Sequence, residues 1–402
     1  MTDAIAIVGA GPAGSRLAQL LAGRGGRVLL FDPHAPWEKP CGGGLTNKVF
    51  CEFPDLTPKL LGARSLRRLD LVFPRGRCRL SMSPALSTVS REALGRELLE
   101  RAVKAGAEHL REKALALSKQ GDRVLVKTGQ GEFEVSLVVG ADGVNSLVRR
   151  TFGRPLSRED ICICFGALVP GRVSLPAVLR FYRGFMGYAW LFPREEASSV
   201  GIALEAGAAR KREFLVGKLR EFVNEEWGRA GLEPPRLERP WAWLLPSLRY
   251  QTFQEQEICG PGWALVGDAA GAADPLTGEG IYYALKTAHL LARSLADDKL
   301  SAYPDLFRLM AEQSIAKVSK VRERFYQPRT LRWLRRGLDY SPSVRALARD
   351  LISGGQGYYD LRARVRREWP RYAAEGALNL IAFGKGERGG KKRAAGGRRE
   401  DL

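Results

Sequence analysis

Hydrophobic and polar positions near the start of the chain predict a strand–helix–strand unit. A short apolar run covers Ala4–Val8, a helical pattern follows it to Ala22, and a second apolar run covers Val28–Phe31. Short apolar runs bounded by turns are typical of buried strands, and i, i+3, i+4 spacing is typical of an amphipathic helix. The chain is therefore predicted to begin with a βαβ unit.

After residue 32 the hydrophobic pattern alternates between aperiodic stretches, strand-like runs and helical spacing. Residues 33–58 show no clear periodicity, so they are expected to form a long functional loop. Residues 66–73 and 78–82 are predicted to pair as a hairpin. An antiparallel sheet is predicted from four alternating runs, Ile161–Leu168, Ala177–Tyr182, Tyr188–Phe192 and Ser198–Leu204. Helices are predicted over Ser90–Lys104, Lys211–Gly228, Ile281–Asp297 and, in a basic region, from Pro304 to about Phe383.

Composition limits the class of protein. The 402 residues exceed one usual core, and 45% hydrophobic with 27% charged residues is ordinary for a globular chain. Six cysteines without a CxxC pair, beside three histidines, predict no metal site and a reducing, cytoplasmic compartment. No run is long enough for a membrane span, and the start of the chain does not resemble a signal peptide.

Charge is concentrated at the end of the chain. The formal net charge is +20, and the residues from Arg308 onward hold 23 basic against 10 acidic side chains. Such a basic end favours an anionic partner, although a solvated surface explains it equally well. We find no recognised nucleic-acid-binding motif, so no specific nucleic-acid partner is expected.

A glycine-rich loop is the first sign of chemistry. Gly9, Gly11 and Gly14 form a Gly-x-Gly-x-x-Gly motif between a predicted strand and a predicted helix. In that context the loop predicts a dinucleotide site, with a pyrophosphate at the N–H groups of the helix. Asp32 ends the next strand, where its carboxylate can accept a hydrogen bond from a ribose hydroxyl.

Two later segments indicate which dinucleotide binds. The segments 138–149 (VVGADGVNSLVR) and 263–280 (WALVGDAAGAADPLTGEG) resemble the secondary fingerprints of the FAD-binding class that includes p-hydroxybenzoate hydroxylase. The resemblance implies that Asp268 binds ribityl or ribose hydroxyls, and that Asp142, Gly143 and Arg91 lie near the phosphates. The helix that Gly280 opens can stabilise a negatively charged flavin. For Glu279 we favour an N-terminal capping role over a catalytic one. The residues predicted to bind FAD are Gly9, Gly11, Ala13, Gly14, Asp32, Cys41, Gly42, Arg91, Asp142, Gly143, Gly267, Asp268, Pro275, Gly278, Gly280 and Ile281.

Two shorter motifs resemble those of the geranylgeranyl reductases, which saturate isoprenoid double bonds. They are Glu38-Lys-Pro-Cys-Gly-Gly-Gly44 and Tyr188-Ala-Trp-Leu-Phe-Pro193, and the resemblance covers roughly residues 1–300. The segment Trp241-Ala-Trp-Leu-Leu-Pro246 superficially resembles a motif of flavin-dependent halogenases. It stands at a different point of the chain, so we interpret it as a strand and turn.

The candidate catalytic residues are Cys41, Tyr188 and Trp190. Cys41 lies on a glycine-rich loop, where its thiol can either donate a proton to carbon or pack as a small apolar group. Tyr188, Trp190 and Phe192 alternate along a predicted strand and so share one face. That face suits an isoprenoid chain, and the alternative is an ordinary sheet core.

These observations predict an α/β flavoprotein with a Rossmann-like FAD domain of the p-hydroxybenzoate hydroxylase type, an antiparallel-sheet substrate domain and a helical C-terminal region. The expected boundaries are 1–65, 83–155 and 255–300 for the FAD domain, 66–82 and 156–254 for the substrate domain, 301–383 for the helical region, and 384–402 for a disordered basic tail.

The expected function is FAD-dependent reduction of isoprenoid C=C bonds in a lipid, quinone or pigment precursor, by flavin N5 hydride transfer coupled to protonation. The alternatives are an FAD-dependent aromatic or quinone monooxygenase and, ranked last, a non-catalytic flavin- or nucleic-acid-binding protein. No second Gly-x-Gly-x-x-Gly is present, so NADPH bound without a Rossmann domain, or an acidic ferredoxin-like protein, is expected to supply electrons.

The segment Thr330–Leu338 is a candidate contact with an anionic membrane surface. Leu331, Leu334 and Leu338 share one helical face, with arginines mostly elsewhere and Trp333 at a flank. Basic amphipathic helices with a tryptophan bind anionic interfaces, which would place a cytoplasmic protein peripherally at the inner face of the membrane. The competing interpretation is a helix packed on the FAD domain with its arginines in water.

Overall fold

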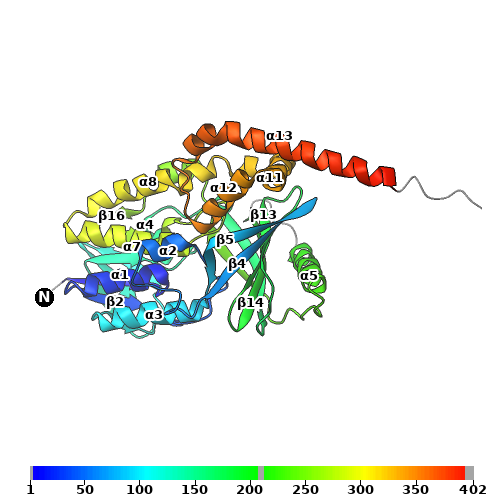
Figure 1. Ribbon diagram of the computed structural model, residues 1–402. Coiled ribbons are helices and arrows are strands. Elements are labelled where there is room, and N and C mark those ends of the chain that lie inside the picture. The colour runs from blue at the N-terminus through cyan, green and yellow to red at the C-terminus, as the bar shows by residue number, and fades with distance from the viewer. Residues whose placement is uncertain (1–2, 207–211, 394–402) are drawn as a thin grey trace, which may run out of the picture.

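The computed structural model describes residues 3–206 and 212–393, which form two large sheets and a layer of C-terminal helices (Figure 1). The first sheet has six strands in the order β16-β17-β10-β1-β2-β6, parallel except for the β16–β17 pair. In that order the strands cover Cys259–Gly260, Trp263–Leu265, Leu137–Gly140, Ala4–Val8, Arg27–Phe31 and Glu108–Leu110. The central strands are apolar because both faces of a parallel sheet are covered.

Helices and a small sheet provide this cover. Helix α1 packs between α3 and α7, and the three-stranded sheet β7-β8-β9 packs against β1 and β10. Ser90 is the N-cap of α3, where its hydroxyl accepts a hydrogen bond from the N–H of Ala93. The bounds are Pro12–Ala22 for α1, Arg91–Lys104 for α3, Leu147–Phe152 for α4, Ile281–Ala296 for α7, Ala116–Gln120 for β7, Arg123–Lys127 for β8 and Glu132–Val135 for β9.

The second sheet has eight strands in the order β15-β11-β14-β13-β12-β4-β5-β3, with α5 (Arg212–Arg229) packed against β11 and β14. Its pairings are antiparallel as predicted, except that β12 and β4 run parallel. In sheet order the strands cover Trp241–Pro246, Ile161–Pro170, Ala197–Glu205, Gly187–Pro193, Ala177–Phe181, Arg64–Phe73, Gly76–Thr88 and Gly44–Leu45. Alternate positions of β13 face opposite sides, with Ala189 and Leu191 in the core under α5.

The predicted loop over residues 33–58 is only partly correct. It contains strand β3 and the short helix α2 (Asn47–Glu52), whose Val49 is buried. Elements this short carry no readable periodicity, which is why the pattern missed them. The predicted hairpin is present but longer, since β5 continues to Thr88 to pair with β3.

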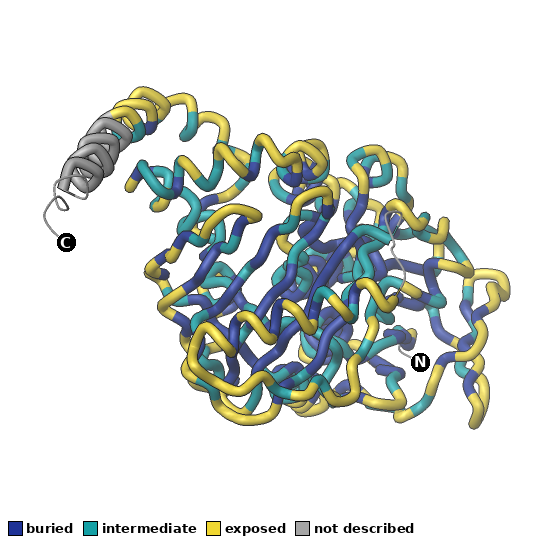
Figure 2. Tube along the Cα trace, turned by 90° about the vertical axis from the view of Figure 1, so that its right-hand side faces the viewer, coloured by how far each residue is buried: buried dark blue, intermediate teal, exposed yellow. Residues whose placement is uncertain are grey.

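The C-terminal region is helical, as predicted, and lies along the upper edge in Figure 1. Figure 2 shows it as a largely exposed layer over the buried strands. The helices are α8 (Tyr303–Gln313), α9 (Ile315–Ser319), α10 (Arg322–Phe325), α11 (Pro328–Tyr340), α12 (Pro342–Ser353) and α13 (Leu361–Arg393), with α6 (Tyr250–Glu255) earlier in the chain. Helix α13 extends to Arg393, past the predicted start of the tail at residue 384. Residues 394–402 lie outside the described part.

The predicted membrane contact through the leucines of α11 is wrong. Leu331 and Leu338 are buried, and Leu334 packs partly against the same core, which includes residues of β4 and β5. The leucines are therefore not available to a bilayer. The competing interpretation is also inexact, because α11 packs on the second sheet rather than on the FAD domain. No helix among the described residues is long and apolar enough to cross a membrane.

Candidate functional site

A cavity of about 1540 Å³ lies where the two sheets meet the C-terminal helices. Its walls come from the glycine-rich loops of the first sheet, from strands β11, β13 and β15 of the second, and from α10–α12. Cavities for a single small ligand measure roughly 300–1,000 Å³. This cavity therefore has room for a large cofactor together with a second ligand.

The loop between β1 and α1 presents the first turn of α1 to the cavity. Gly9 has a φ of +101°, and a Cβ on Gly14 would lie 1.9 Å from the carbonyl oxygen of Gly9, so both positions require glycine. A Cβ on Gly11 would meet no atom within 4 Å. Gly11 is the N-cap and has no side chain to accept from the first N–H groups of α1, an arrangement that fits a phosphate.

Asp32 lies beside this loop, at the end of β2. Its Oδ2 accepts a hydrogen bond from the N–H of Ala10 at 2.9 Å, and its Oδ1 accepts from the N–H groups of His34 and Ala35. These bonds orient the carboxylate at the cavity wall. Whether it also accepts from a ribose hydroxyl stays a prediction.

Asp142 and Arg91 contribute polar atoms that have no hydrogen-bond partner among the described residues. Oδ2 of Asp142 accepts from the N–H of Leu147 at 2.6 Å, while its Oδ1 and Nε of Arg91 are unpaired. Burial raises the pKa of Asp142, while the hydrogen bond from the N–H of Leu147 opposes this rise. Buried polar groups in folded proteins normally have partners, so these atoms fit a site for a polar ligand.

The third segment surrounds the N-terminus of α7. Gly280 is the N-cap of α7 and has no side chain to cap it, so the positive end of the helix faces the cavity. Asp268 lies in a 3₁₀ turn over Gly267–Ala270, where its Oδ2 accepts from Lys39 at 3.4 Å. Lys39 also lies 5.4 Å from the ring centroid of Trp243.

The interpretation of Glu279 as a capping acid is wrong. Its carboxylate accepts a hydrogen bond from the hydroxyl of Thr46 and forms an ion pair with Lys48, and Gly280 rather than Glu279 is the N-cap. Glu279 instead joins α7 to the segment that leads into α2. Because α2 was not predicted, this partner set could not be foreseen.

The predicted cofactor residues converge on this cavity, with two exceptions. Gly14 and Gly267 lie behind its wall, where a Cβ on Gly267 would come within 2.9 Å of the Cβ of Ala13. These glycines allow close packing of backbone segments rather than ligand contact. The open N-terminus of α1, the uncapped N-terminus of α7 and the unpaired polar atoms together fit a dinucleotide such as FAD. The other predicted residues line the cavity: Gly9, Gly11, Ala13, Asp32, Cys41, Gly42, Arg91, Asp142, Gly143, Asp268, Pro275, Gly278, Gly280 and Ile281.

Cys41 also lines the cavity, and its backbone is held on two sides. Its carbonyl oxygen accepts hydrogen bonds from Arg194 at 2.8 Å and from the hydroxyl of Ser199 at 2.9 Å, while its Sγ accepts from the N–H of Gly43. Burial opposes the thiolate, but the charges of Arg91 and Arg194 and the Gly43 N–H outweigh it. The pKa of the Cys41 thiol therefore lies below its ordinary value.

Arg194 and Glu38 also belong to this arrangement, and neither was predicted as a site residue from the sequence. Glu38 accepts from the hydroxyl of Ser90 and from two N–H groups at the start of α3, and Arg194 donates to Glu38 at 2.6 Å. Burial raises the pKa of Glu38, but Arg194 and these hydrogen bonds lower it overall. Glu38 opens the first of the two family-like motifs, and Arg194 directly follows the second. These positions were the sequence signal that could have identified them.

Replacing Arg194 with methionine is expected to raise the pKa of the Cys41 thiol, since a nearby positive charge favours the thiolate. Alkylation of the Cys41 peptide, followed by mass spectrometry across a pH series, should move to higher pH and slow severalfold at neutral pH. Arg194→Lys, which keeps the charge, should stay nearer to the unmodified protein. Arg172→Met, at an exposed position, is the matched control; an unchanged pH profile in Arg194→Met would contradict the assignment.

One face of β13 forms an aromatic wall of the cavity, as predicted. Tyr188, Trp190 and Phe192 all line it. The hydroxyl of Tyr188 donates to the carbonyl oxygen of Thr277, and burial raises the pKa of Tyr188 far above its ordinary value. The indole N–H of Trp190 donates to Ser199 at 3.1 Å, which links the wall to the hydrogen bonds on Cys41.

The segment Trp241–Pro246 contributes more to the site than the sequence suggested. Residues 241–246 form strand β15, which confirms the predicted strand, but they also line the cavity. The rings of Trp190 and Trp241 stack with centroids 6.1 Å apart. Pairing of β15 with β11 brings the motif to the aromatic wall, and that pairing is not visible in the local pattern.

The C-terminal helices close the apolar part of the cavity. Residues of these helices line it, although the sequence pattern predicted no site residue in this region: Phe325, Tyr326, Leu334 and Ile352. The hydroxyl of Tyr326 donates to the carbonyl oxygen of Leu276 at 3.2 Å. These helices thus contact the loop that precedes α7.

The chain is similar to one described protein family and to several proteins named as reductases. The family described as Lycopene cyclase protein matches residues 4–159. A digeranylgeranylglycerophospholipid reductase of Methanocella arvoryzae is 30% identical over 349 residues, covering 79% of this chain and 86% of the relative. A menaquinone reductase of Mycolicibacterium smegmatis is 28% identical over 354 residues, covering 80% and 83%.

A solved structure with the same fold is that of a geranylgeranyl bacteriochlorophyll reductase-like protein from Thermoplasma acidophilum. Its TM-score is 0.69 at 20% identity, and the match covers 91% of this chain and 98% of that one. The same fold recurs in a probable FAD-dependent monooxygenase of Pseudomonas aeruginosa. The predicted fold class is thereby confirmed.

Proposed function

The chain belongs to the geranylgeranyl reductase family of flavin-dependent oxidoreductases, and on that premise we propose that it reduces isoprenoid C=C bonds. The observation that carries the proposal is that the aromatic wall and Cys41 border the same cavity as the glycine-rich loops. A long apolar chain can then lie beside a bound flavin while water is excluded.

In this proposal the first turn of α1 holds the pyrophosphate of FAD, Asp32 holds a ribose, and Asp268 holds ribityl or ribose hydroxyls. The uncapped N-terminus of α7 stabilises negative charge on the ring system. Reduced FAD supplies a hydride to the substrate. NADPH or a ferredoxin-like protein supplies the electrons.

The remaining requirement is a proton for the neighbouring carbon, and Cys41 provides it. Its thiol is a stronger acid than an ordinary cysteine because Arg91 and Arg194 lie close. Arg194 and Ser199 hold its backbone, so the donor keeps a fixed position at the cavity wall. Tyr188 stays neutral and keeps its hydroxyl on Thr277, where it supports the loop before α7.

The substrate we propose is a polyprenyl group on a membrane lipid, quinone or pigment precursor. The relatives named above are reductases of a digeranylgeranylglycerophospholipid and of menaquinone. Lipid extracts from a strain lacking the gene are compared by mass with extracts of the parent strain. The strain lacking the gene should accumulate a polyprenyl compound with two hydrogens fewer than the parent's compound for each bond left unreduced. Identical lipid masses in the two strains would contradict the proposal.

A further inference from the structure

The C-terminal helices carry the most exposed large hydrophobic side chains among the described residues. Trp333 is 69% exposed, Tyr359 65% and Trp369 63%, ahead of every other large apolar side chain in that part of the chain. Trp333 lies on α11, Tyr359 in the loop between α12 and α13, and Trp369 on α13. Helix α13 packs against both α11 and α12. Tryptophan and tyrosine are the side chains that favour membrane–water interfaces.

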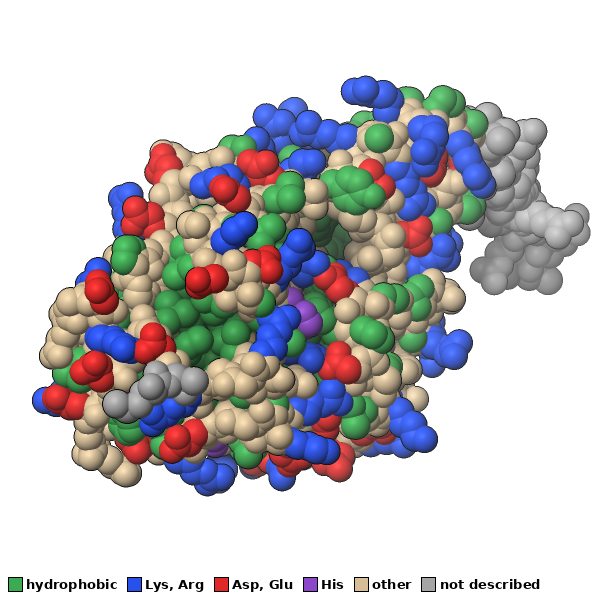
Figure 3. Space-filling view, turned by 90° about the vertical axis from the view of Figure 1, so that its left-hand side faces the viewer, with side chains coloured by type: hydrophobic (Ala, Val, Ile, Leu, Met, Phe, Trp, Pro, Cys, Tyr) green, Lys and Arg blue, Asp and Glu red, His purple; other side chains and the backbone are tan. Residues whose placement is uncertain are grey.

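Exposed arginines lie on the same two helices as Trp333 and Trp369. Figure 3 shows basic side chains along the upper edge of the molecule, where the C-terminal helices lie. The guanidinium of Arg336 lies 5.8 Å from the ring centroid of Trp333. The exposed arginines of α11 and the first turns of α13 are Arg329, Arg332, Arg336, Arg362, Arg366, Arg367 and Arg371.

On α11 and over residues 361–377 of α13, the acidic side chains are already paired. Asp339 of α11 pairs with Arg335. On α13, Glu368 accepts from Arg364 and Tyr372, and Glu375 accepts from Ser341, Ser343 and Arg371. The outward surface therefore keeps a positive excess that complements an anionic partner.

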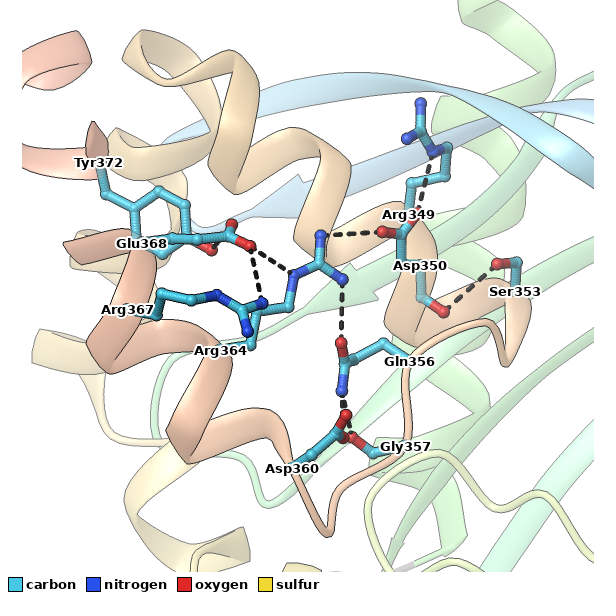
Figure 4. Close-up of polar contacts among 10 residues, drawn as sticks. All are labelled: Arg349, Asp350, Ser353, Gln356, Gly357, Asp360, Arg364, Arg367, Glu368 and Tyr372. Carbon is cyan, nitrogen blue, oxygen red and sulfur yellow. Dashed lines mark hydrogen bonds and ion pairs between the residues drawn. The ribbon is translucent and has the colours of Figure 1, made fainter. Parts of the chain in front are cut away.

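Figure 4 shows a polar network that joins α12, the loop after it and α13. Arg364 donates to Asp350 at the end of α12, to Gln356 in the loop and to Glu368 on α13. These bonds fix the loop in a conformation in which both Tyr358 and Tyr359 line the cavity while Tyr359 stays exposed. The loop thus forms part of the cavity wall and part of the aromatic surface.

We propose that the outward surface of α11–α13, with Trp333, Tyr359 and Trp369, docks on a bilayer that contains anionic lipid. Contact is shallow, because the leucines of α11 are buried in the protein and only aromatic and arginine side chains reach the interface. The substrate class rests on the proposed function, whereas the docking itself does not. Indole rings and arginines together suit the headgroup region of an anionic bilayer. The tryptophan variant and the two vesicle compositions distinguish such a bilayer from an acidic protein.

The test is flotation of the full chain with vesicles of phosphatidylcholine alone and of equal parts phosphatidylcholine and phosphatidylglycerol. We expect binding to the mixed vesicles that falls as salt rises. Trp333→Ala/Trp369→Ala and Arg332→Glu/Arg336→Glu/Arg366→Glu should each weaken it by about tenfold or more. The matched controls are Leu60→Ala with Leu309→Ala, and Lys59→Glu/Lys104→Glu/Lys119→Glu, all exposed elsewhere.

Three outcomes would overturn the proposal. The first is no binding to the anionic vesicles, and the second is equal binding to both kinds of vesicle. The third is a loss of binding in the charge variant with none in the tryptophan variant, which would indicate a general electrostatic surface for an acidic protein. Reduction of a detergent-dispersed substrate is measured separately, so that failure of the docking proposal can be told from failure of the proposed function. Vesicle binding without reduction would contradict the proposed function alone. Reduction without vesicle binding would contradict the docking surface alone.

Discussion

Replacing Cys41 with serine is expected to slow alkene reduction by about tenfold or more while FAD remains bound. A serine hydroxyl is a far weaker acid than a thiol whose pKa is lowered by Arg91 and Arg194. The backbone contacts to Arg194 and Ser199 involve the carbonyl oxygen of Cys41 and do not depend on the side chain. The loop should therefore keep its shape.

The measurement is the rate of product formation per bound flavin, with the visible spectrum as the check on FAD content. Cys51→Ser, at an exposed position in α2, is the matched control and should behave like the unmodified protein. If Cys41→Ala reduced its substrate at the normal rate, the thiol would serve only for packing.

Replacing Asp268 with alanine is expected to remove most of the flavin from the purified protein, which should otherwise be yellow and release FAD on denaturation. Asp268 lies in the turn before α7 and lines the cavity, where a carboxylate can accept from ribityl or ribose hydroxyls. Its partner Lys39 would also lose its ion pair.

Flavin content per protein, measured after denaturation, is the readout. Asp305→Ala removes an exposed carboxylate on α8 that pairs with Arg308, and it should leave flavin content unchanged. Thermal unfolding of both variants checks that the fold survives. Full FAD occupancy in Asp268→Ala would show that this segment does not anchor the cofactor.

Local patterns were sufficient for the βαβ unit that begins the first sheet and for its glycine-rich loop. Gly9, Gly11 and Gly14 belong to a motif whose meaning depends only on the adjacent strand and helix, and the βαβ unit is local in sequence. The alternation of β13 likewise predicted a shared face for Tyr188, Trp190 and Phe192. In both cases the determining contacts are between neighbours in the chain.

Contacts between distant segments could not be predicted in this way. Arg194 reaches Cys41 across 153 positions of the chain, and Trp241 stacks on Trp190 only because β15 pairs with β11. The leucine pattern of α11 correctly indicated an apolar face. It could not tell whether that face meets a bilayer or the core beside β4 and β5, since both environments favour the same residues.

The most direct test of the central claim is a single turnover without oxygen. The purified holoprotein, reduced with dithionite, is mixed with a detergent-dispersed geranylgeranyl lipid, and the product is analysed by mass spectrometry. We predict a product heavier by two hydrogens for each reduced bond, formed as the flavin spectrum returns to its oxidised state. An unchanged lipid under these conditions, together with oxygen uptake and a product heavier by one oxygen atom in air, would contradict the account and indicate a monooxygenase.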